Sequence, residues 1–243
     1  MEKSEIIAIL RRELETVVAE RRVAKANPAM NAARTALRQF QSQRMARTHA
    51  DLLAEKETGP AARFFLSDLY GPYDLTERDA NLERIIPTME RLLPAAALET
   101  VAEAVALDAL SEKLDAGMAR RLGESFSEAD YIDAYRQIGK RTDRERQLAH
   151  VESVGAALCE LVRIPLVGST LAMMRGPSRL AKLSELHSFL ERGFKAFKGM
   201  KRPYDFVTTI IQRERAIMDA MYAGKKNPFA TPVTVDHASI ANA

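Results

Sequence analysis

The sequence predicts an all-α protein, folded as a single-domain bundle of about nine or ten helices. Apolar residues recur three and four positions apart along most of the chain, which is the period of an amphipathic helix. No stretch alternates β-branched residues with polar ones between turn signals, so strands are not expected. A chain of 243 residues, 47% of them hydrophobic, buries roughly 70% or more of its unfolded surface and needs no metal or crosslink to fold.

Two helices are expected in the first 53 residues. Ser4 is the expected N-cap of the first, because its hydroxyl can accept a backbone N–H. The second begins at Asn27-Pro28, since proline suits the first helical position. The apolar stripe of the first helix consists of Ile6, Ile7, Leu10, Leu14, Val17 and Val18. That of the second consists of Met30, Ala33, Leu37, Phe40 and Met45.

Proline and glycine divide the next part of the chain. A short helix from Ala61 is expected to end at Gly71-Pro72, because glycine adopts the left-handed cap conformation without steric cost. Another helix follows from Asp74 or Thr76. Pro87 lies inside its pattern and is expected to kink or divide it, since proline lacks the backbone N–H that a helix interior requires.

Five further helices are expected, over residues 94–123, 127–139, 142–163, 180–199 and 204–221. The range 180–199 has the clearest pattern, because its apolar positions trace one face. These positions are Leu180, Leu183, His187, Leu190, Phe194 and Phe197. Beyond Gly224 the chain is rich in proline and small residues. Residues 1–224 are therefore expected to form the domain, and 225–243 a flexible tail.

Composition and the chain start indicate a cytoplasmic protein without a membrane span. Cys159 is the only cysteine, so the chain forms no internal disulfide. Residues 1–5 are charged and lead into an amphipathic stretch, with no apolar signal-peptide core. The most apolar stretch, residues 151–174, is interrupted by charges and a proline and is too polar to span a bilayer.

Charge is distributed unevenly along the chain. Residues 1–49 carry a net +5, residues 50–135 a net −10 and residues 136–243 a net +8. Either these segments fold against one another, or the basic C-terminal half is reserved for an anionic partner. Arginine outnumbers lysine 25 to 11, which favours planar, bidentate contacts with carboxylate or phosphate.

Motifs for known chemistry are missing. None of the four histidines has a glutamate three positions before it, so the di-iron pattern of helical bundles is not present and no metal site is expected. Cys159 lies in an apolar helix, where a structural role is expected. The sequence has no Walker loop, no dinucleotide fingerprint and no Gly-x-Ser-x-Gly elbow. A cofactor stays unknown, and whether the protein is an enzyme stays open.

The strongest functional signal is a basic stretch from Arg163 to Arg202, which contains nine basic and two acidic residues. Within it, basic residues recur every three positions as a stripe, formed by Arg192, Lys195, Lys198 and Lys201. The stripe either binds phosphate groups, lipid or nucleic acid, or is a solvated face neutralised by the acidic middle of the chain. Nucleic acid is disfavoured, because no helix-turn-helix spacing is clear and tryptophan is absent.

A sharper candidate for anion binding is the helix start near Gly176-Pro177. Free backbone N–H groups at a helix N-terminus attract anions, and basic side chains lie close by in the sequence. Ordinary helix initiation requires the same Gly-Pro-Ser sequence and is the alternative. The candidate anion-binding residues are Arg175, Ser178, Arg179 and Lys182.

The run Phe-Phe-Leu-Ser-Asp-Leu-Tyr-Gly-Pro at residues 64–72 resembles the bacterial FFLEELY-motif family. Later blocks at residues 141–147, 161–167, 174–177 and 189–194 are also similar, so the resemblance spans roughly residues 35–224. Ser67-Asp68 stand where the family name has Glu-Glu. The family has no assigned activity, cofactor or catalytic residue. The resemblance therefore implies a single whole-chain unit and no reaction.

The resemblance also implies that several charged residues belong to a family pattern. Buried ion pairs contribute little net stability, so such residues are candidates for a polar pocket. The candidates are Arg78, Asp79, Arg84, Arg144, Glu145, Arg163 and Arg192.

Taken together, these patterns favour a non-catalytic binding or regulatory protein. We expect it to recognise an anionic small molecule or an acidic protein surface through residues 136–243. The alternative is an enzyme whose active site is an interhelical pocket lined by arginine and carboxylate side chains. A third hypothesis is a homodimer formed through an exposed part of Phe64-Phe65-Leu66.

Overall fold

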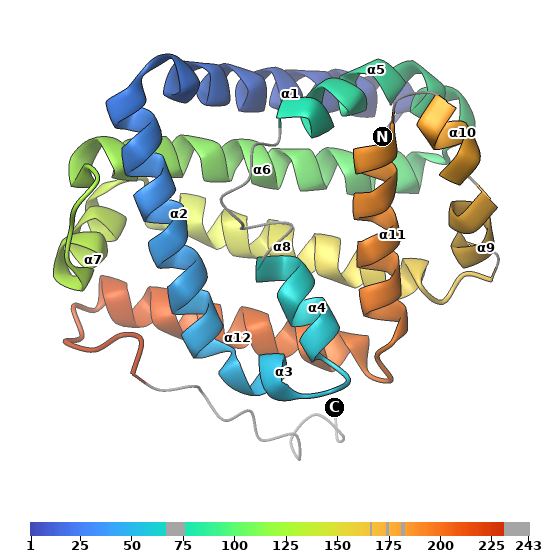
Figure 1. Ribbon diagram of the computed structural model, residues 1–243. Helices are drawn as coiled ribbons and strands as arrows, with labels where there is room; N and C mark the ends of the chain where they lie inside the picture. The colour runs from blue at the N-terminus through green and yellow to red at the C-terminus, as the bar shows by residue number, and fades with distance from the viewer. Residues whose placement is uncertain (67–75, 166, 174, 181–182, 231–243) are drawn as a thin grey trace.

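Four long helices lie side by side and form the frame of the molecule (Figure 1). They are α1 (Lys3–Ala26), α6 (Ala95–Leu122), α8 (Arg141–Leu161) and α12 (Pro203–Tyr222). The computed structural model describes residues 1–66, 76–165, 167–173, 175–180 and 183–230. Within these ranges every regular element is a helix, and nine helices have seven residues or more. The predicted all-α class is confirmed.

Three helices cross the face of this frame (Figure 1): α2 (Pro28–Thr48), α4 (Gly59–Phe64) and α11 (Ser184–Lys198). The short α3 (Ala50–Ala54) joins α2 to α4. The remaining helices are α5 (Thr76–Leu92), which packs on α1, then α7 (Glu128–Gln137), α9 (Val167–Met173) and α10 (Arg175–Leu180). Among the described helices, none is both long and apolar enough to span a bilayer.

Hydrogen bonds that involve side chains fix three of the helix starts. The Asn27 side chain accepts the backbone N–H of Met30 at 3.1 Å and caps α2. Ser127 caps α7, where its hydroxyl accepts the N–H of Asp130. The prediction of Ser4 as the cap of α1 is wrong. Glu2 is the cap, because the Glu5 carboxylate accepts the backbone N–H of Glu2 at 3.0 Å and fixes the start two residues earlier.

Two expected helix boundaries also differ from the structure. Pro87 does not divide α5, which continues from Thr76 to Leu92. The helix expected over 180–199 is shorter in the structure, because Leu180 is the last residue of α10 and α11 begins only at Ser184. Between them the backbone N–H of Leu183 donates to the carbonyl of Ser178 at 2.8 Å, which is not an α-helical bond. Both helices pack on α9. The apolar period of the sequence does not reveal the break between them, because Leu180 and Leu183 keep the three-residue spacing across it.

Buried apolar side chains form three clusters between these helices. One lies between α1, α5 and α6 and includes Leu10 and Leu98. A second lies between α2, α6, α7 and α12, and a third joins α4, α8, α11 and α12 around Phe197. Cys159 in the third is fully buried, as predicted, and burial raises the pKa of its thiol to about 11. It is a neutral packing residue at physiological pH.

The aromatic run that carries the family resemblance begins in this third cluster. Phe64 is buried and packs against Phe189, while half-buried Phe65 contacts Phe197 and Phe206. Residues 67–72 of the run lie outside the described residues, as do the expected helix end at Gly71-Pro72 and residues 231–243 of the expected tail. The start of that tail packs on the bundle, where the Phe229 ring lies 6.2 Å from that of Tyr131.

Candidate functional site: an interhelical cavity

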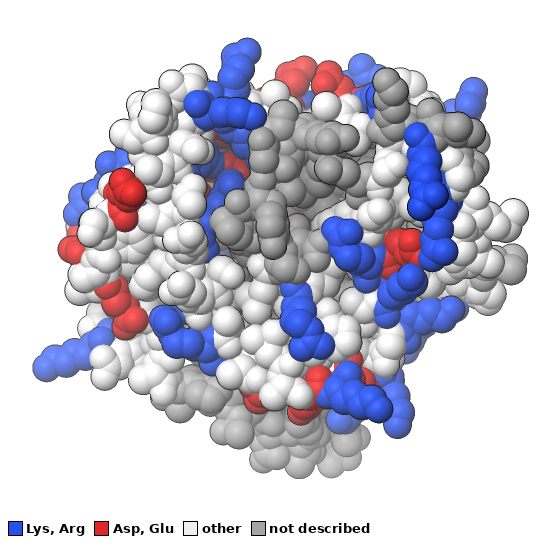
Figure 2. Space-filling view, in the orientation of Figure 1, with Lys and Arg blue, Asp and Glu red and all other residues white. Residues whose placement is uncertain are grey.

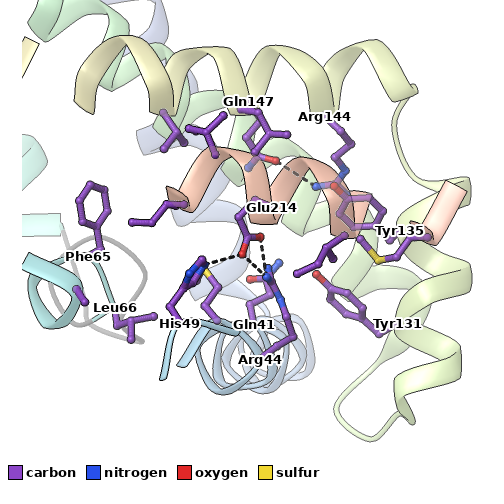
Figure 3. A pocket seen from close by; sticks show the side chains of 18 residues that line it. Gln41, Arg44, His49, Phe65, Leu66, Tyr131, Tyr135, Arg144, Gln147 and Glu214 are labelled. Carbon is purple, nitrogen blue, oxygen red and sulfur yellow. Dashed lines mark hydrogen bonds and ion pairs between the residues drawn. The ribbon is translucent and has the colours of Figure 1, made fainter. Parts of the chain in front are cut away.

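A cavity of about 110 Å³ lies between α2, α7, α8 and α12, with Phe65 and Leu66 at one end (Figure 3). Most of its lining side chains are apolar, and a small number of polar groups point into it, as in many small-molecule sites. The polar side chains, including the two tyrosines, come from four elements: Gln41, Arg44 and His49 from α2 and its end, Tyr131 and Tyr135 from α7, Arg144 and Gln147 from α8, and Glu214 from α12.

A hydrogen-bonded ion pair occupies one side of this cavity. A terminal guanidinium nitrogen of Arg44 lies 2.6 Å from both carboxylate oxygens of Glu214. His49 Nε2 lies 3.0 Å from Oε1 of the same carboxylate. Burial raises the pKa of Glu214, but the charge of Arg44 and the hydrogen bond from His49 outweigh it and hold the pKa at about 2. Glu214 is therefore ionised at neutral pH and balances the charge of Arg44.

The ionised Glu214 also determines which ring nitrogen of His49 acts as the hydrogen-bond donor. A carboxylate only accepts hydrogen bonds, so Nε2 of His49 carries the proton. In the neutral imidazole the other ring nitrogen, Nδ1, is then an acceptor. It is buried and has no hydrogen-bond partner in the part of the chain that the structure describes.

Arg144 lies on the α8 side of the cavity and has a different set of contacts. Its side chain is buried, with 2% of the residue exposed. Its guanidinium group contacts the Met118 sulfur at 3.1 Å and the amide oxygen of Gln147 at 3.5 Å. It also lies over the Tyr135 ring, 4.1 Å from the centroid. Within the described ranges it forms no ion pair, and its Nε has no hydrogen-bond partner.

The charge balance of the cavity follows from these contacts. Arg44 and Glu214 neutralise each other, whereas Arg144 adds one positive charge that nothing described in the lining compensates. An arginine stays protonated at all physiological pH values, so this charge is permanent. Burial raises the pKa of Tyr131 and of Tyr135, which keeps both phenols neutral. The cavity therefore has a net positive charge in apolar surroundings.

The predicted anion-binding residues lie elsewhere, near α10. Arg175 is exposed and pairs with Glu191, with Nε 3.1 Å from the carboxylate. Ser178 is buried inside α10, three residues after its start, and Arg179 is exposed. Lys182 lies outside the described residues. Hydrogen bonds from Arg175 and Lys195 lower the pKa of Glu191 to about 2, so one carboxylate serves two basic residues.

The predicted polar-pocket residues are not brought together. Only Arg144 lines the cavity. Asp79 is buried beside Arg21, and Arg84 is exposed and donates to Asn81 at 2.8 Å. Glu145 is half-buried and pairs with Arg141, while Arg163, which pairs with Glu160, and Arg192 on α11 are exposed. The side chain of Arg78 lies outside the described part.

A second buried ionic network, which includes Asp79, joins α1, α2, α5 and α6. Glu112 accepts from Arg21 Nε at 2.9 Å and from Arg38 at 2.6 Å, and also pairs with Arg34. Arg21 further pairs with Asp79 and with Asp108, the latter at 2.8 Å. Three arginines thus meet three carboxylates. The pairs support the interpretation that the acidic middle segment folds against the basic N-terminal segment.

The sequence was compared with known protein families, curated proteins and solved structures, and one family matches. The sequence profile of the family described as "Domain of unknown function (DUF8198)" matches residues 20–228. The chain belongs to this family. No curated protein and no solved structure matches the chain. The matched range of this DUF8198 chain includes the whole cavity lining, from Gln41 to Met221.

Sequence reasoning found one polar residue of the DUF8198 cavity, Arg144, and missed the pair formed by Arg44 and Glu214. A signal for Glu214 was present, because it stands among Ile210, Ile211 and Ile217 at helical spacing and so falls on the buried face of α12. His49 had no such signal. It lies where α2 ends, and only the packing of α12 brings a carboxylate to it.

Proposed function

We propose that this protein is a non-catalytic binding protein that takes a small anionic molecule into the interhelical cavity, where Arg144 meets its negative charge. The observation that carries the proposal is the buried guanidinium group of Arg144, which forms no ion pair within the described residues. Arg144 belongs to the basic C-terminal half, so the proposal keeps the expected class of ligand. It takes the cavity, and not α10, as the site.

The energetics favour an anion at this position. Burying a charged group without a counter-charge is costly. Two unit charges about 4 Å apart attract by about 1 kcal/mol in water and by about 4 kcal/mol at the effective dielectric of a protein site. A ligand anion beside Arg144 therefore gains more than it would at an exposed arginine, and it also removes the unfavourable burial of an unpaired charge.

Recognition of an acidic protein surface has less support. Lys and Arg side chains gather over α10 and α11 on one side of the face shown in Figure 2, with a carboxylate among them. Glu191 already pairs with Arg175 and Lys195, and Lys198 lies over the Phe194 ring at 5.4 Å. Exposed pairs of this kind contribute little and are screened by salt.

An enzyme is the second candidate, and the contact between His49 and Glu214 favours it. A carboxylate that orients an imidazole is a common arrangement for proton transfer, and Nδ1 of His49 is the ring nitrogen left to accept a proton. The two candidates differ in the fate of the ligand. A catalytic site returns a chemically altered molecule after incubation, whereas a binding protein returns the molecule unchanged.

The test is a thermal-shift screen of the purified protein and two variants against small organic anions, nucleotides and inorganic phosphate. A ligand that binds only the native state raises the melting temperature. Arg144→Met is expected to lose the shift. Arg146→Met is the matched control, because Arg146 lies on the same helix and is exposed, with its guanidinium 3.4 Å from Asp143. Equal shifts in both variants, or no shift with any anion, would contradict the proposal.

A further inference from the structure

The properties of the cavity indicate which class of anion it accepts. Resting on the proposed function, we infer that the ligand is a small monocarboxylate: a single carboxylate bound to Arg144 and a short apolar body lying between α8 and α12. Three features of the cavity carry the inference: its charge, the shape of its donor group and its size.

The charge of the cavity fits a monoanion. Arg144 is the only lining residue within the described ranges whose charge is left uncompensated, because Arg44 is matched by Glu214. A ligand with one negative charge makes the site neutral. A dianion, such as a dicarboxylate or the doubly charged form of inorganic phosphate, would leave a surplus negative charge near the ionised Glu214, and like charges in a buried site repel strongly.

The donor group fits a carboxylate. A guanidinium group presents parallel N–H donors in one plane, which match the two oxygens of a carboxylate. The Tyr135 ring, 4.1 Å from the guanidinium carbon, supports this plane from one face. Nε of Arg144 is buried and has no hydrogen-bond partner in the described part of the chain, so the fold leaves one donor of this group unsatisfied.

Size and lining determine the body of the ligand. The cavity measures about 110 Å³, somewhat less than a buried cavity of roughly 150 Å³ that is known to hold a benzene ring, so a body of about three to five carbon atoms fits and a six-carbon ring is the upper limit. Leu148 and Val151 on α8 and Ile210 and Ile211 on α12 supply apolar surface. Long-chain fatty acids are too large for this volume, and acetate leaves most of the apolar surface without contacts.

Isothermal titration calorimetry on the intact chain tests the inference. The probes are acetate, butyrate, 3-methylbutanoate, benzoate, octanoate and inorganic phosphate at constant ionic strength, together with butyramide and benzamide as uncharged counterparts. We expect binding by butyrate, 3-methylbutanoate or benzoate, at least about tenfold tighter than by the matching amide. Acetate, octanoate and phosphate are expected to bind at least tenfold more weakly. The comparison of acid with amide uses the unmodified protein and is independent of how any variant folds.

Variants then assign the binding to the cavity. Arg144→Met is expected to lose at least tenfold in affinity for the best carboxylate, Arg144→Lys to lose less, and Arg146→Met to match the parent. Phosphate that binds through Arg144 in place of monocarboxylates would overturn the inference and leave the proposed function standing. Amides that bind as tightly as acids, or carboxylate binding that is unchanged in Arg144→Met, would overturn both.

Discussion

At the scale of single residues, two arginines of one cavity differ in their partners, and this difference determines what each contributes. Arg44 contacts a carboxylate and belongs to a complete ion pair. Arg144 contacts a thioether, an amide and an aromatic ring, which together compensate only part of the loss of hydration. Residues that serve ligands are commonly less favourable for the free fold than a purely structural choice would be.

Effects of different size on stability are expected when the two arginines are replaced. Arg44→Met leaves Glu214 buried without its main counter-charge and is expected to lower the free energy of unfolding by about 3–5 kcal/mol. Arg144→Met removes a buried charge that has no ion pair and is expected to change stability by less than about 1 kcal/mol or to raise it. Urea denaturation measures both. A large loss for Arg144→Met would indicate that its contacts within the fold are mainly structural.

Glu214 also introduces a pH dependence with a defined sign. Its pKa is about 2 in the folded chain, against 4.5 as its ordinary value. The unfolded state thus binds the proton first, so the stabilisation is complete above about pH 5 and is lost as the pH falls towards 2. The full effect is about 3 kcal/mol. Glu214→Gln is expected to flatten the fall in unfolding free energy between pH 6 and pH 3, and a parallel fall in parent and variant would disprove this assignment.

At the scale of elements, the approach of α8 to α12 positions the two sides of the cavity. A Cβ added to Gly155 on α8 would lie 2.7 Å from Cγ1 of Val207 on α12, which is closer than real side chains pack. Glycine at this position therefore permits the close approach of the two helices, one helical turn beyond Val151, which lines the cavity.

Replacing this glycine is expected to widen the contact between the helices. Gly155→Ala gains up to about 1 kcal/mol in helix propensity but overpacks the interface, at a cost of about 1–3 kcal/mol, so a net loss of stability is expected. Gly176→Ala on α10 is the control, because a Cβ there meets nothing within 4 Å, and a neutral or stabilising effect is expected. Thermal denaturation of both variants measures the difference. Equal effects would show that the α8–α12 contact tolerates a methyl group.

At the scale of the whole molecule, the frame of α1, α6, α8 and α12 could be predicted as helices, but not as neighbours. The apolar period identifies a buried face and says nothing about which helix covers it. For the same reason the break between α10 and α11 was missed, since Leu180 and Leu183 keep the period on both sides of it. Among the residues of the cavity, Arg144 could be named as a candidate from the family resemblance. The pairing of Glu214 with His49 could not be predicted, because it depends on tertiary packing alone.

The ionic network around Arg21 acts at this larger scale, because it joins four helices. Arg21→Met leaves Asp79, which is 2% exposed, without a counter-charge from α1, and a loss of about 3–5 kcal/mol is expected. The exposed pair of Arg141 with Glu145 is the comparison, where Arg141→Met is expected to cost less than about 1 kcal/mol. Chemical denaturation of the two variants checks the contrast. A small loss for Arg21→Met would mean that the network contributes little to holding α1, α2, α5 and α6 together.

Association of the whole chain is a separate prediction. Phe64 is buried within one copy, where it packs against Phe189, so Phe65 and Leu66 are the two of the three hypothesised residues that offer partly exposed surface to a second copy. Light scattering over a range of concentrations measures the mass in solution. A strictly monomeric mass would remove the homodimer hypothesis, and a dimer that Phe65→Ser dissociates would support it.

The two tyrosines beside Arg144 give this chain an optical property. The sequence contains six tyrosines and no tryptophan, so its intrinsic ultraviolet emission is tyrosine emission alone. Tyr131 and Tyr135 both line the cavity, and the Tyr135 ring lies against the guanidinium group. A molecule that occupies the cavity changes the surroundings of two of the six emitters. The protein thus reports on its own occupancy by fluorescence, without any attached label.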